Sequence, residues 1–573
     1  MGVCLSKVIF IFAFLICGAS FALPFRDYPD GDFYSDAMAV ILSLCVVVCF
    51  GRRVAMTHIV WVFSFFLLIA LVAGERGYYY QGWFFPIAAV ICLFLYFSTV
   101  SALEANLRES FLTGCLWGVV AGGCFNVVVG YFQLFGWVDH ISALVFRGGY
   151  QVYGNFGQRN NFSTYLLVFS VVLCGLVGKR NINSVLAVIM LALVSLLVAF
   201  AASRMAILAV LTLLFFALIA GRVRGWSTKE STAVCSYAFF SIFFSLCLIF
   251  LWFFDMGASS RISVAGDASR LQEWAKAWGI FLDHPWGVGF GNYARYSFVY
   301  QLESGLPSQI TWSHAHNIAL HFLVELGVWT FPLLLLAIWV LKGVLGSCLR
   351  NNVDGLVVAA VLLIFCVHSL LEYPLWYMNF LALFLSFLAI YTPVVKRLGG
   401  NVVRVIAMCG LVLGGVIVFL YSSLAGYVYP AKDSRVNLQR MEELIGYSLN
   451  PALDWPADRV LMEYLAVEDG PEWEYKMCKS IFMVVKEPNY IYLERVALFA
   501  LARQNFDFAS SVLKARYAVY SSLPDDYLVE SIRRMWPDRE VTYLQKITSE
   551  RQAAFPGYKA YELALPEYCD SYK

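Results

Sequence analysis

Residues 312–327 read Trp312-Ser313-His314-Ala315-His316-Asn317-Ile318-Ala319-Leu320-His321-Phe322-Leu323-Val324-Glu325-Leu326-Gly327. Three of the seven histidines of the chain fall within eight of these residues, where a polar loop gives way to an apolar run. Titratable groups gathered at a membrane surface favour proton-transfer chemistry. Helical spacing puts His316 and Gly327 on one face and lets His321 pair with Glu325. The alternative is that these polar residues only decorate the mouth of a helix.

The composition indicates a membrane protein. The chain has 573 residues, of which 60% are hydrophobic and 14% charged, and its mean hydropathy is +0.70. Soluble domains carry about 25% charged residues. We therefore expect an all-α, polytopic membrane helix bundle of about 13 transmembrane helices, followed by a small helical C-terminal domain. No nucleic-acid motif, no C-x-x-C metal motif and no cofactor fingerprint is found in the sequence.

The apolar runs have nearly the length that a helix needs to cross about 30 Å of hydrocarbon. The first run is also compatible with a signal peptide, because Lys7 precedes its apolar core and Ser20-Phe21-Ala22 resembles a cleavage site. Retention and cleavage predict the same topology downstream. The runs lie at roughly 8–25, 37–50, 54–73, 83–100, 111–133, 161–178, 183–201, 204–220, 232–254, 317–341, 353–371, 375–393 and 405–424.

Positive charges alternate along these spans and predict the orientation. With the N-terminus inside, pairs such as Arg52-Arg53 and Lys179-Arg180 fall in inner loops. An odd number of spans then places the C-terminal segment outside, which is the periplasm for a bacterial inner membrane. We expect three parts: N-terminal transmembrane helices at 1–133, a membrane core with outer loops at 134–424, and a soluble helical domain at 425–573.

Arginines on the predicted outer side suggest an anionic substrate. The seventh and eighth spans are separated by almost nothing except Arg204. Arginine presents a planar fork that grips phosphate, and a lipid-borne diphosphate would lie at this depth. Arg270, with Arg147 or Arg159, could join it. The alternatives are that Arg204 snorkels to lipid headgroups and that Arg270 forms a structural salt bridge with Glu273.

Two glycine-containing runs have more than one interpretation. The run 154–161 could present backbone N–H groups to an anion or could only cap a helix. The run 287–291 superficially looks like a nucleotide fingerprint, but no strand-turn-helix unit surrounds it, so a tight turn is the simpler interpretation.

Four short motifs in order resemble one known superfamily. His316-Asn317, nine residues, Gly327, two residues and Thr330 match the signature of the lipid-linked glycan ligases and polymerases. That superfamily contains the O-antigen ligases and the bacterial O-linked oligosaccharyltransferases, and the run 269–291 looks like its core. Tyr153–Gln158 and Leu371–Trp376 resemble the pilin-type, protein-glycosylating branch. The resemblance covers roughly residues 140–394.

The resemblance implies a metal-independent glycosyltransferase without a cofactor. It would transfer a preassembled oligosaccharide from undecaprenyl diphosphate, at the periplasmic face of the inner membrane, to a Ser or Thr hydroxyl of a pilin-like or other periplasmic protein. His316 would take the acceptor proton, and Arg204 and Arg270 would bind the diphosphate. The predicted substrate-binding residues are Gln158, Arg159, Arg147, His314, Asn317, Glu372 and Tyr373.

Two alternative functions remain open from the sequence. The first keeps the chemistry but changes the acceptor to a lipid A core sugar, as in O-antigen ligase, or to another lipid-linked repeat, as in a polymerase. The second is a proton-coupled transporter that relays protons through His321, Glu325, His368 and Glu372, although no duplicated half is found in the sequence.

Only Cys478 and Cys569 of the fifteen cysteines lie in the soluble segment. In an oxidising compartment they could form a disulfide. The alternative is two unrelated cysteines, one of them buried and the other near a mobile chain end.

Overall fold

The structure is a computed structural model, and it describes most of the chain. The described residues are 2–26, 30–72, 84–141, 144–145, 152–201, 203–254, 266–304, 311–450, 453–465, 467, 473–520, 523, 525–539, 542–545, 547 and 549.

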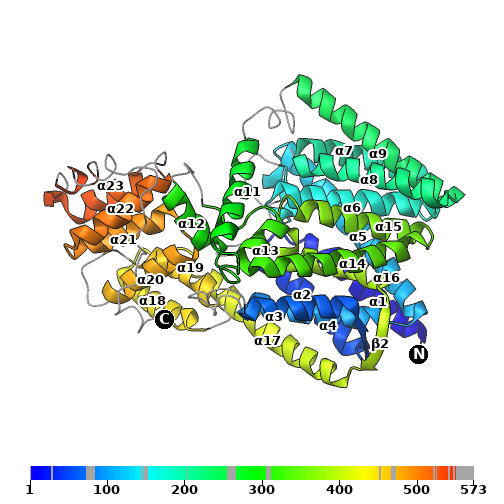
Figure 1. Cartoon of the computed structure of the whole chain (residues 1–573), viewed down its shortest axis with the longest axis horizontal. Coiled ribbons are helices and arrows are strands. Elements are labelled where there is room, and N and C mark those ends of the chain that lie inside the picture. The colour runs from blue at the N-terminus through cyan, green and yellow to red at the C-terminus, as the bar shows by residue number, and fades with distance from the viewer. Residues whose placement is uncertain are drawn as a thin grey trace.

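Apolar helices form a bundle that makes up the larger part of the molecule (Figure 1). In the described part of the chain, eight helices are long and apolar enough to cross a membrane, and five shorter apolar helices accompany them. The prediction of an all-α polytopic membrane protein is therefore confirmed. The helices are α1 (Gly2–Cys17), α2 (Phe33–Phe50), α3 (His58–Val72), α4 (Phe84–Ser101), α5 (Ala105–Leu134), α6 (Arg159–Gly178), α7 (Ser184–Phe200), α8 (Arg204–Arg224), α9 (Thr228–Phe253), α13 (Ile318–Leu326) with α14 (Thr330–Leu349), α15 (Val353–Ser369), α16 (Met378–Tyr391) and α17 (Asn401–Ala425).

A two-stranded antiparallel sheet closes one end of the bundle. Strand β1 (Arg53–Thr57) pairs with β2 (Val394–Gly399), with Met56 opposite Lys396. The span predicted to start at 54 therefore starts at His58. The apolar composition of this segment suits a strand as well as a helix, so the sequence pattern gave no boundary. The basic segments around Arg53 and Lys396, predicted as inner loops, meet at the end of the bundle away from the C-terminal helices (Figure 1).

The interior of the bundle is packed through small residues and one fully enclosed helix. A Cβ atom added to Gly118 of α5 would lie 2.4 Å from the carbonyl oxygen of Phe14 in α1, so only glycine permits this approach. Helix α6 is buried from Asn161 to Gly178. An entirely enclosed helix at the centre gives its neighbours a fixed reference, and the first turn of α6 carries part of the site described below.

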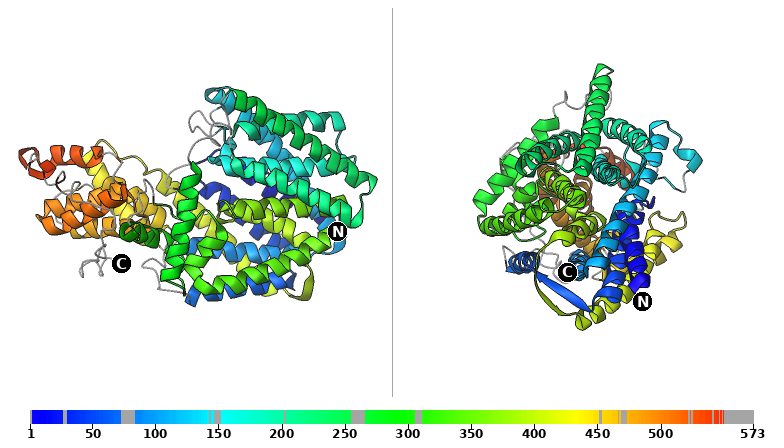
Figure 2. Two further views of the ribbon diagram at one scale, coloured as in Figure 1. Left: turned by 45° about the horizontal axis from the view of Figure 1, so that its top comes forward. Right: turned by 90° about the vertical axis from the view of Figure 1, so that its right-hand side faces the viewer.

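The C-terminal helices form a separate layer at the other end of the bundle (Figures 1 and 2). In this layer α21 and α22 form an antiparallel pair, held by buried Arg516, whose Nη2 lies 2.8 Å from Glu494 and 3.0 Å from Asp525. Cys478 is buried and disulfide-bonded, and Cys569 lies outside the described residues. The helices are α18 (Ser434–Ser448), α19 (Asp454–Tyr464), α20 (Trp473–Lys486), α21 (Tyr490–Ala502), α22 (Phe506–Tyr520) and α23 (Asp526–Met535).

Two helices lie between the bundle and the C-terminal layer: α11 (Gly266–Asp283) and α12 (Tyr293–Ser304). Helix α11 runs across the direction of the bundle helices, at the end that faces the C-terminal layer (Figures 1 and 2). Helix α12 contributes Phe298 and Leu302 to the core of that layer. Short 3-10 turns complete the described fold: η1 (Ala19–Phe21), η3 (Val138–Ile141), η4 (Gly154–Phe156), η5 (Gly327–Trp329), η6 (Pro374–Trp376) and η7 (Pro537–Arg539).

Candidate active site

Glu372 joins three segments that are distant in the sequence. Its Oε1 accepts hydrogen bonds from Arg270 Nη2 at 2.5 Å and from Asn160 Nδ2 at 2.9 Å. Its Oε2 accepts from His316 Nδ1 at 2.8 Å. His316 and Glu372 are both buried. The structure thus brings together three residues singled out from the sequence, Arg270, His316 and Glu372, and adds Asn160.

The ends of several helices build this cluster. Asn160 is in the first turn of α6, Arg270 is in α11, and Glu372 follows the C-terminus of α15, where its N–H donates to the carbonyl of His368 at 2.8 Å. Asn317 is the N-cap of α13 and accepts from two backbone N–H groups, while its Nδ2 donates to Leu370 O at 3.0 Å. Asn317 therefore ties the His316 loop to the Glu372 turn.

His316 lies outside the helix, so the prediction that it shares a helical face with Gly327 is wrong. Helix α13 begins at Ile318. Its φ of 50° is in the left-handed region that non-glycine residues rarely adopt. Backbone strain of this kind costs roughly 1–3 kcal/mol and clusters at functional sites. With this backbone conformation the chain does not continue the helix, and the imidazole of His316 points to Glu372.

The hydrogen bond to Glu372 determines which nitrogen of His316 can act as a base. An ionised carboxylate only accepts hydrogen bonds, so Nδ1 carries the proton that it donates. In the neutral imidazole the lone pair is then on Nε2. This Nε2 is buried and has no hydrogen-bond partner among the described residues.

The surroundings of Glu372 keep its carboxyl group ionised. Burial raises the pKa of Glu372, but the hydrogen bond from His316, followed by the charges of His316 and Arg270, outweighs burial, so that the pKa lies below 4.5. A charged carboxylate beside the imidazole stabilises the imidazolium that forms when Nε2 takes a proton.

The neighbouring His314 has a different environment. Its ring lies 3.4 Å from the ring of Tyr373 and 4.5 Å from that of His316, measured between centroids. Burial and then the charges of His316 and His321 lower the pKa of His314 to about 2, so this imidazole is neutral at physiological pH. Burial likewise raises the pKa of Tyr373 to about 12. Of the two histidines, His316 has the carboxylate partner that a general base uses.

Arg270 does not form the salt bridge with Glu273 that was the alternative. Glu273 instead lies 2.6 Å from Lys276 Nζ and accepts from Tyr293 Oη at 2.6 Å. The guanidinium of Arg270 has five N–H donors, and its contact with Glu372 leaves others for a phosphate group.

The starts of α6 and α8 also meet at this site, through Asn160 and Ser203. The Oγ of Ser203 donates to Asn160 Oδ1 at 2.7 Å, which connects the start of α8 with Glu372 through one side chain. Arg204 follows Ser203 as the first residue of α8 and is half-buried, and Arg159 is the first residue of α6. Arg147 lies outside the described residues.

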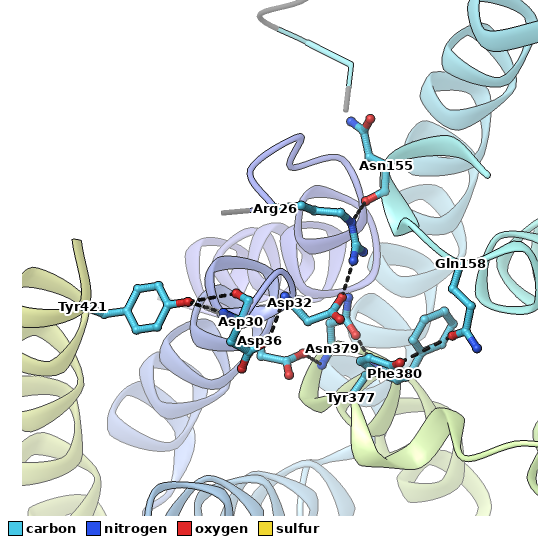
Figure 3. A network of polar contacts seen from close by, with 10 residues as sticks. All are labelled: Arg26, Asp30, Asp32, Asp36, Asn155, Gln158, Tyr377, Asn379, Phe380 and Tyr421. Carbon is cyan, nitrogen blue, oxygen red and sulfur yellow. Dashed lines mark hydrogen bonds and ion pairs between the residues drawn. The ribbon is translucent and has the colours of Figure 1, made fainter. Parts of the chain in front are cut away.

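Gln158 belongs to an adjacent polar network (Figure 3). Its Oε1 accepts from Tyr377 Oη at 3.4 Å. In the same network, Arg26 lies 2.7 Å from Asp32 and donates to the carbonyl of Asn155 at 2.6 Å. This network fixes the backbone around Gln158, next to the Glu372 cluster.

The first residues of the run 154–161 use their backbone N–H groups within the fold. The N–H of Gly154 donates to Gln133 Oε1 at 2.7 Å, as does that of the preceding Tyr153 at 3.0 Å, and the N–H of Asn155 donates to Asn126 Oδ1 at 3.4 Å. The N–H groups of Gly154 and Asn155 are therefore not available to an anion, and both interpretations stay open for the rest of the run.

The predicted pair of His321 and Glu325 is present and has a structural environment. His321 Nε2 lies 3.5 Å from Glu325 Oε2, while Oε1 accepts from the N–H groups of Gly291 and Tyr293 at 2.9 and 3.3 Å. Glu325 therefore fixes the loop that contains residues 287–291.

Gly327 of the superfamily signature closes the same loop. Its φ is 63°, and a Cβ atom added to it would lie 2.3 Å from the carbonyl carbon of Trp286. Only glycine allows the end of α13 to pack directly on the 285–287 backbone. The glycines near 287 thus make a tight turn, as expected, with the N–H of Gly287 donating to the carbonyl of His284 at 2.9 Å.

Sequence reasoning missed several residues at the site. Asn160 lies in the run 154–161, but nothing in the sequence distinguishes its side chain from a helix cap, and the same holds for Ser203. Thr164 Oγ1 lies 2.8 Å from Nδ1 of the fully buried His368, below the Glu372 turn. The ring of Trp312 packs edge-on at 4.3 Å from that of His316. Among the described residues, no group of three His, Cys, Asp or Glu side chains is arranged to hold a metal ion.

Comparisons with known proteins indicate what the chain is similar to. The family model described as O-Antigen ligase matches residues 189–335, and the model described as Virulence factor membrane-bound polymerase, C-terminal, matches residues 356–445. The chain is 24% identical to the ComP-specific O-oligosaccharyltransferase of Acinetobacter baylyi over 378 residues. This match covers 64% of this chain and 67% of the relative. Residues 189–335 thus match the O-antigen ligase family, and the similarity of the chain to an O-oligosaccharyltransferase supports an enzyme of the glycosyltransferase type.

Proposed function

We propose that this protein transfers a preassembled oligosaccharide from undecaprenyl diphosphate to a Ser or Thr hydroxyl of a pilin-like or other periplasmic protein. The observation that carries the proposal is the arrangement around Glu372: His316 is held through Nδ1, its Nε2 has no hydrogen-bond partner among the described residues, and Arg270 is bonded to the same carboxylate. This pairs a general base with a phosphate-binding group within one cluster.

The proposed reaction is a single displacement at the anomeric carbon. The acceptor hydroxyl oxygen forms a bond to this carbon while its proton passes to His316 Nε2. The bond between the anomeric carbon and the phosphate oxygen breaks, and the electron pair leaves with undecaprenyl diphosphate. Arg270 and Arg204 stabilise the negative charge on the leaving group, and Glu372 stabilises the imidazolium until His316 releases its proton.

An apolar cavity beside the cluster supports a lipid-linked donor. Its volume is about 1020 Å³, and it extends among α3, α4, α14 and α16. Ser369 and Leu370, which immediately precede the Glu372 turn, are part of its lining together with Ile318, the first residue of α13. A cavity of this size and character suits the isoprenoid chain of the donor, with the diphosphate near Arg270.

We further propose that the site faces the periplasm from the inner membrane, with the N-terminus in the cytoplasm. The positive-inside pattern supports this orientation, since Lys179 and Arg180 follow the end of α6 that is opposite Asn160. The three parts proposed are N-terminal helices at 1–133, the O-antigen-ligase-like core at 134–424 and the periplasmic helical domain at 425–573. An alkaline phosphatase fusion at the C-terminus tests the orientation, because the enzyme is active only in the periplasm.

The acceptor distinguishes the proposed function from its main alternative. An O-antigen ligase would modify a lipid A core sugar, whereas the similarity to an O-oligosaccharyltransferase favours a protein acceptor. Mass spectrometry of periplasmic and pilin proteins from cells with and without this gene tests the choice. We expect glycosylated Ser or Thr peptides that depend on the gene. Unmodified proteins, together with a gene-dependent change in lipopolysaccharide, would favour the ligase.

A further inference from the structure

Helix α11 presents an apolar face that nothing in the described structure covers. Leu271 is 61% exposed, Trp278 is 47% exposed and Leu282 is 60% exposed. At 100° per residue these side chains fall within about 40° of one another around the helix, so they form one stripe. The opposite face is buried and carries Glu273, Lys276 and Ile280. A continuous stripe of large apolar side chains on a helix indicates an interaction surface.

The exposed polar side chains of α11 that the structure describes lie on one flank of the stripe, whereas Arg270, on the other flank, is directed to Glu372. Gln272 and Asp283 are exposed and lie at about 100° and 120° from Leu271 around the helix. On the other flank is Phe281, whose ring centroid is 6.3 Å from that of Phe331 in the first turn of α14. One flank is therefore suited to water, and the other adjoins a membrane-crossing helix.

Apolar ring contacts connect α11 with α14. Beyond the end of α11, Trp286 is 66% exposed, and its ring lies 6.5 Å from that of Trp329, just before α14. The span 318–349, which contains α14, is long and apolar enough to cross a membrane. Its outward face is formed by exposed apolar side chains: Phe331, Leu335, Ile338 and Trp339.

We infer that α11 is an interfacial helix that lies in the outer headgroup region of the bilayer, with its Leu271–Trp278–Leu282 stripe inserted in lipid. Its course across the bundle direction, at the end of the bundle, gives it the orientation of a helix in the membrane plane (Figures 1 and 2). Tryptophan side chains prefer the boundary between water and lipid, and Trp278, Trp286 and Trp329 would lie at this boundary. Because the stripe adjoins the exposed apolar face of the membrane-crossing helix α14, we expect the bilayer, not a protein partner, to cover it.

The seating of α11 has a consequence for the site. Arg270 lies next to the stripe on the same helix and reaches the buried Glu372. A helix anchored in the headgroup layer holds Arg270 at the depth where the phosphates of a lipid lie. This consequence rests on the proposed function, whereas the lipid contact itself does not.

Photo-crosslinking of the full-length protein in nanodiscs tests the contact. The discs contain phosphatidylethanolamine and phosphatidylglycerol, and p-benzoyl-phenylalanine replaces Trp278 or Leu282, or as matched controls Gln272 or Asp283. Each variant is first checked for insertion by its yield and elution profile. After irradiation, intact mass spectrometry detects adducts that carry the mass of one phospholipid.

We expect lipid adducts at positions 278 and 282, at least fivefold above those at 272 and 283. Equal adduct levels at all four positions would overturn the inference. Absence of lipid adducts at 278 and 282 would also overturn it, and so would crosslinks at these positions to a second copy or to an added pilin. Because the readout is the lipid adduct and not glycan transfer, an inactive protein with the expected adducts would count against the proposed function alone.

Discussion

Two buried glutamates in this protein each have a histidine partner, but their other partners differ. Glu325 pairs with His321 one turn away on the same helix and accepts two backbone N–H groups from the loop before α12. Glu372 binds side chains from three segments that are distant in the sequence: Arg270, His316 and Asn160.

The comparison separates a carboxylate that holds a loop from one that prepares a reaction. Glu325 accepts hydrogen bonds from backbone N–H groups, which cannot act as a base or bind an anion while they donate to it. Each imidazole has one nitrogen without a hydrogen-bond partner among the described residues, Nε2 of His316 and Nδ1 of His321. What distinguishes Glu372 is that it also fixes a guanidinium that can contact an anion. His316 also sits on strained backbone, whereas His321 is inside a regular helix. The predictions below test this separation.

The largest difference is expected between the two histidines. His316→Ala removes the proposed base and should lower the transfer rate about 10³-fold, since general-base catalysis contributes roughly 10²–10⁴-fold. His321→Ala should retain most of the activity and lower the thermal stability or the yield. Glycosylated acceptor is quantified in membranes that contain equal amounts of each variant. Similar activity of the two variants would remove the distinction between the clusters.

Replacing each carboxylate by its amide sharpens the comparison. Glu372→Gln loses the charge that stabilises the imidazolium and should reduce transfer about 100-fold, while Glu325→Gln keeps an oxygen for the backbone N–H groups and should stay within about tenfold of the wild type. The same kinetic assay as for the histidine variants provides the numbers. A Glu372→Gln variant with full activity would contradict the role of the charge.

The pH dependence of stability follows from the lowered pKa of Glu372. Burial opposes the shift, but His316 and Arg270 determine its sign. A group with a depressed folded-state pKa contributes stability above its unfolded pKa, near 4.5, and this contribution is lost as the pH falls through the folded value. The difference in thermal stability between the wild type and Glu372→Gln should therefore be constant from pH 8 to about pH 5 and shrink below it. If the two proteins were equally stable at neutral pH and differed only in acid, the pKa of Glu372 would not be lowered in the folded protein.

The geometry of the proposed diphosphate contact gives a smaller effect. Arg270→Lys and Arg204→Lys keep the charge but lose the planar fork, and each should lower transfer about 10- to 100-fold with unchanged insertion in the membrane. Arg350→Lys, at the exposed end of α14, serves as the control and should be without effect. Wild-type activity in Arg204→Lys would instead favour contact with headgroups.

The smallest expected effect concerns Asn160. Asn160→Ala removes one hydrogen bond to Glu372, worth about 1 kcal/mol, and should cost roughly five- to tenfold in activity. Asn160→Asp places a second carboxylate beside Glu372 and should cost more, because like charges at this distance repel. If the aspartate variant were the more active one, the link from α6 to Glu372 would not matter for transfer.

The sequence predicted the bundle well because its signals are strong and local. Long apolar runs identify the spans, and the signature around His316 and Gly327 locates the site. The sequence did not reveal that His316 precedes α13 with positive φ, because helical periodicity continues through Asn317. Glu372 could not be recognised as the centre of the cluster either. Its partners Asn160 and Arg270 are 212 and 102 positions away, and such contacts depend on packing between helices.

The most direct test of the account is a reconstituted transfer reaction. Purified protein in nanodiscs is supplied with an undecaprenyl diphosphate-linked oligosaccharide and a pilin acceptor, and the intact mass of the pilin is followed over time. The account predicts a mass increase equal to that of the oligosaccharide, present with His321→Ala and absent with His316→Ala. An unmodified pilin with the wild-type protein, in a parallel reaction where a lipid A core acceptor is glycosylated, would contradict it.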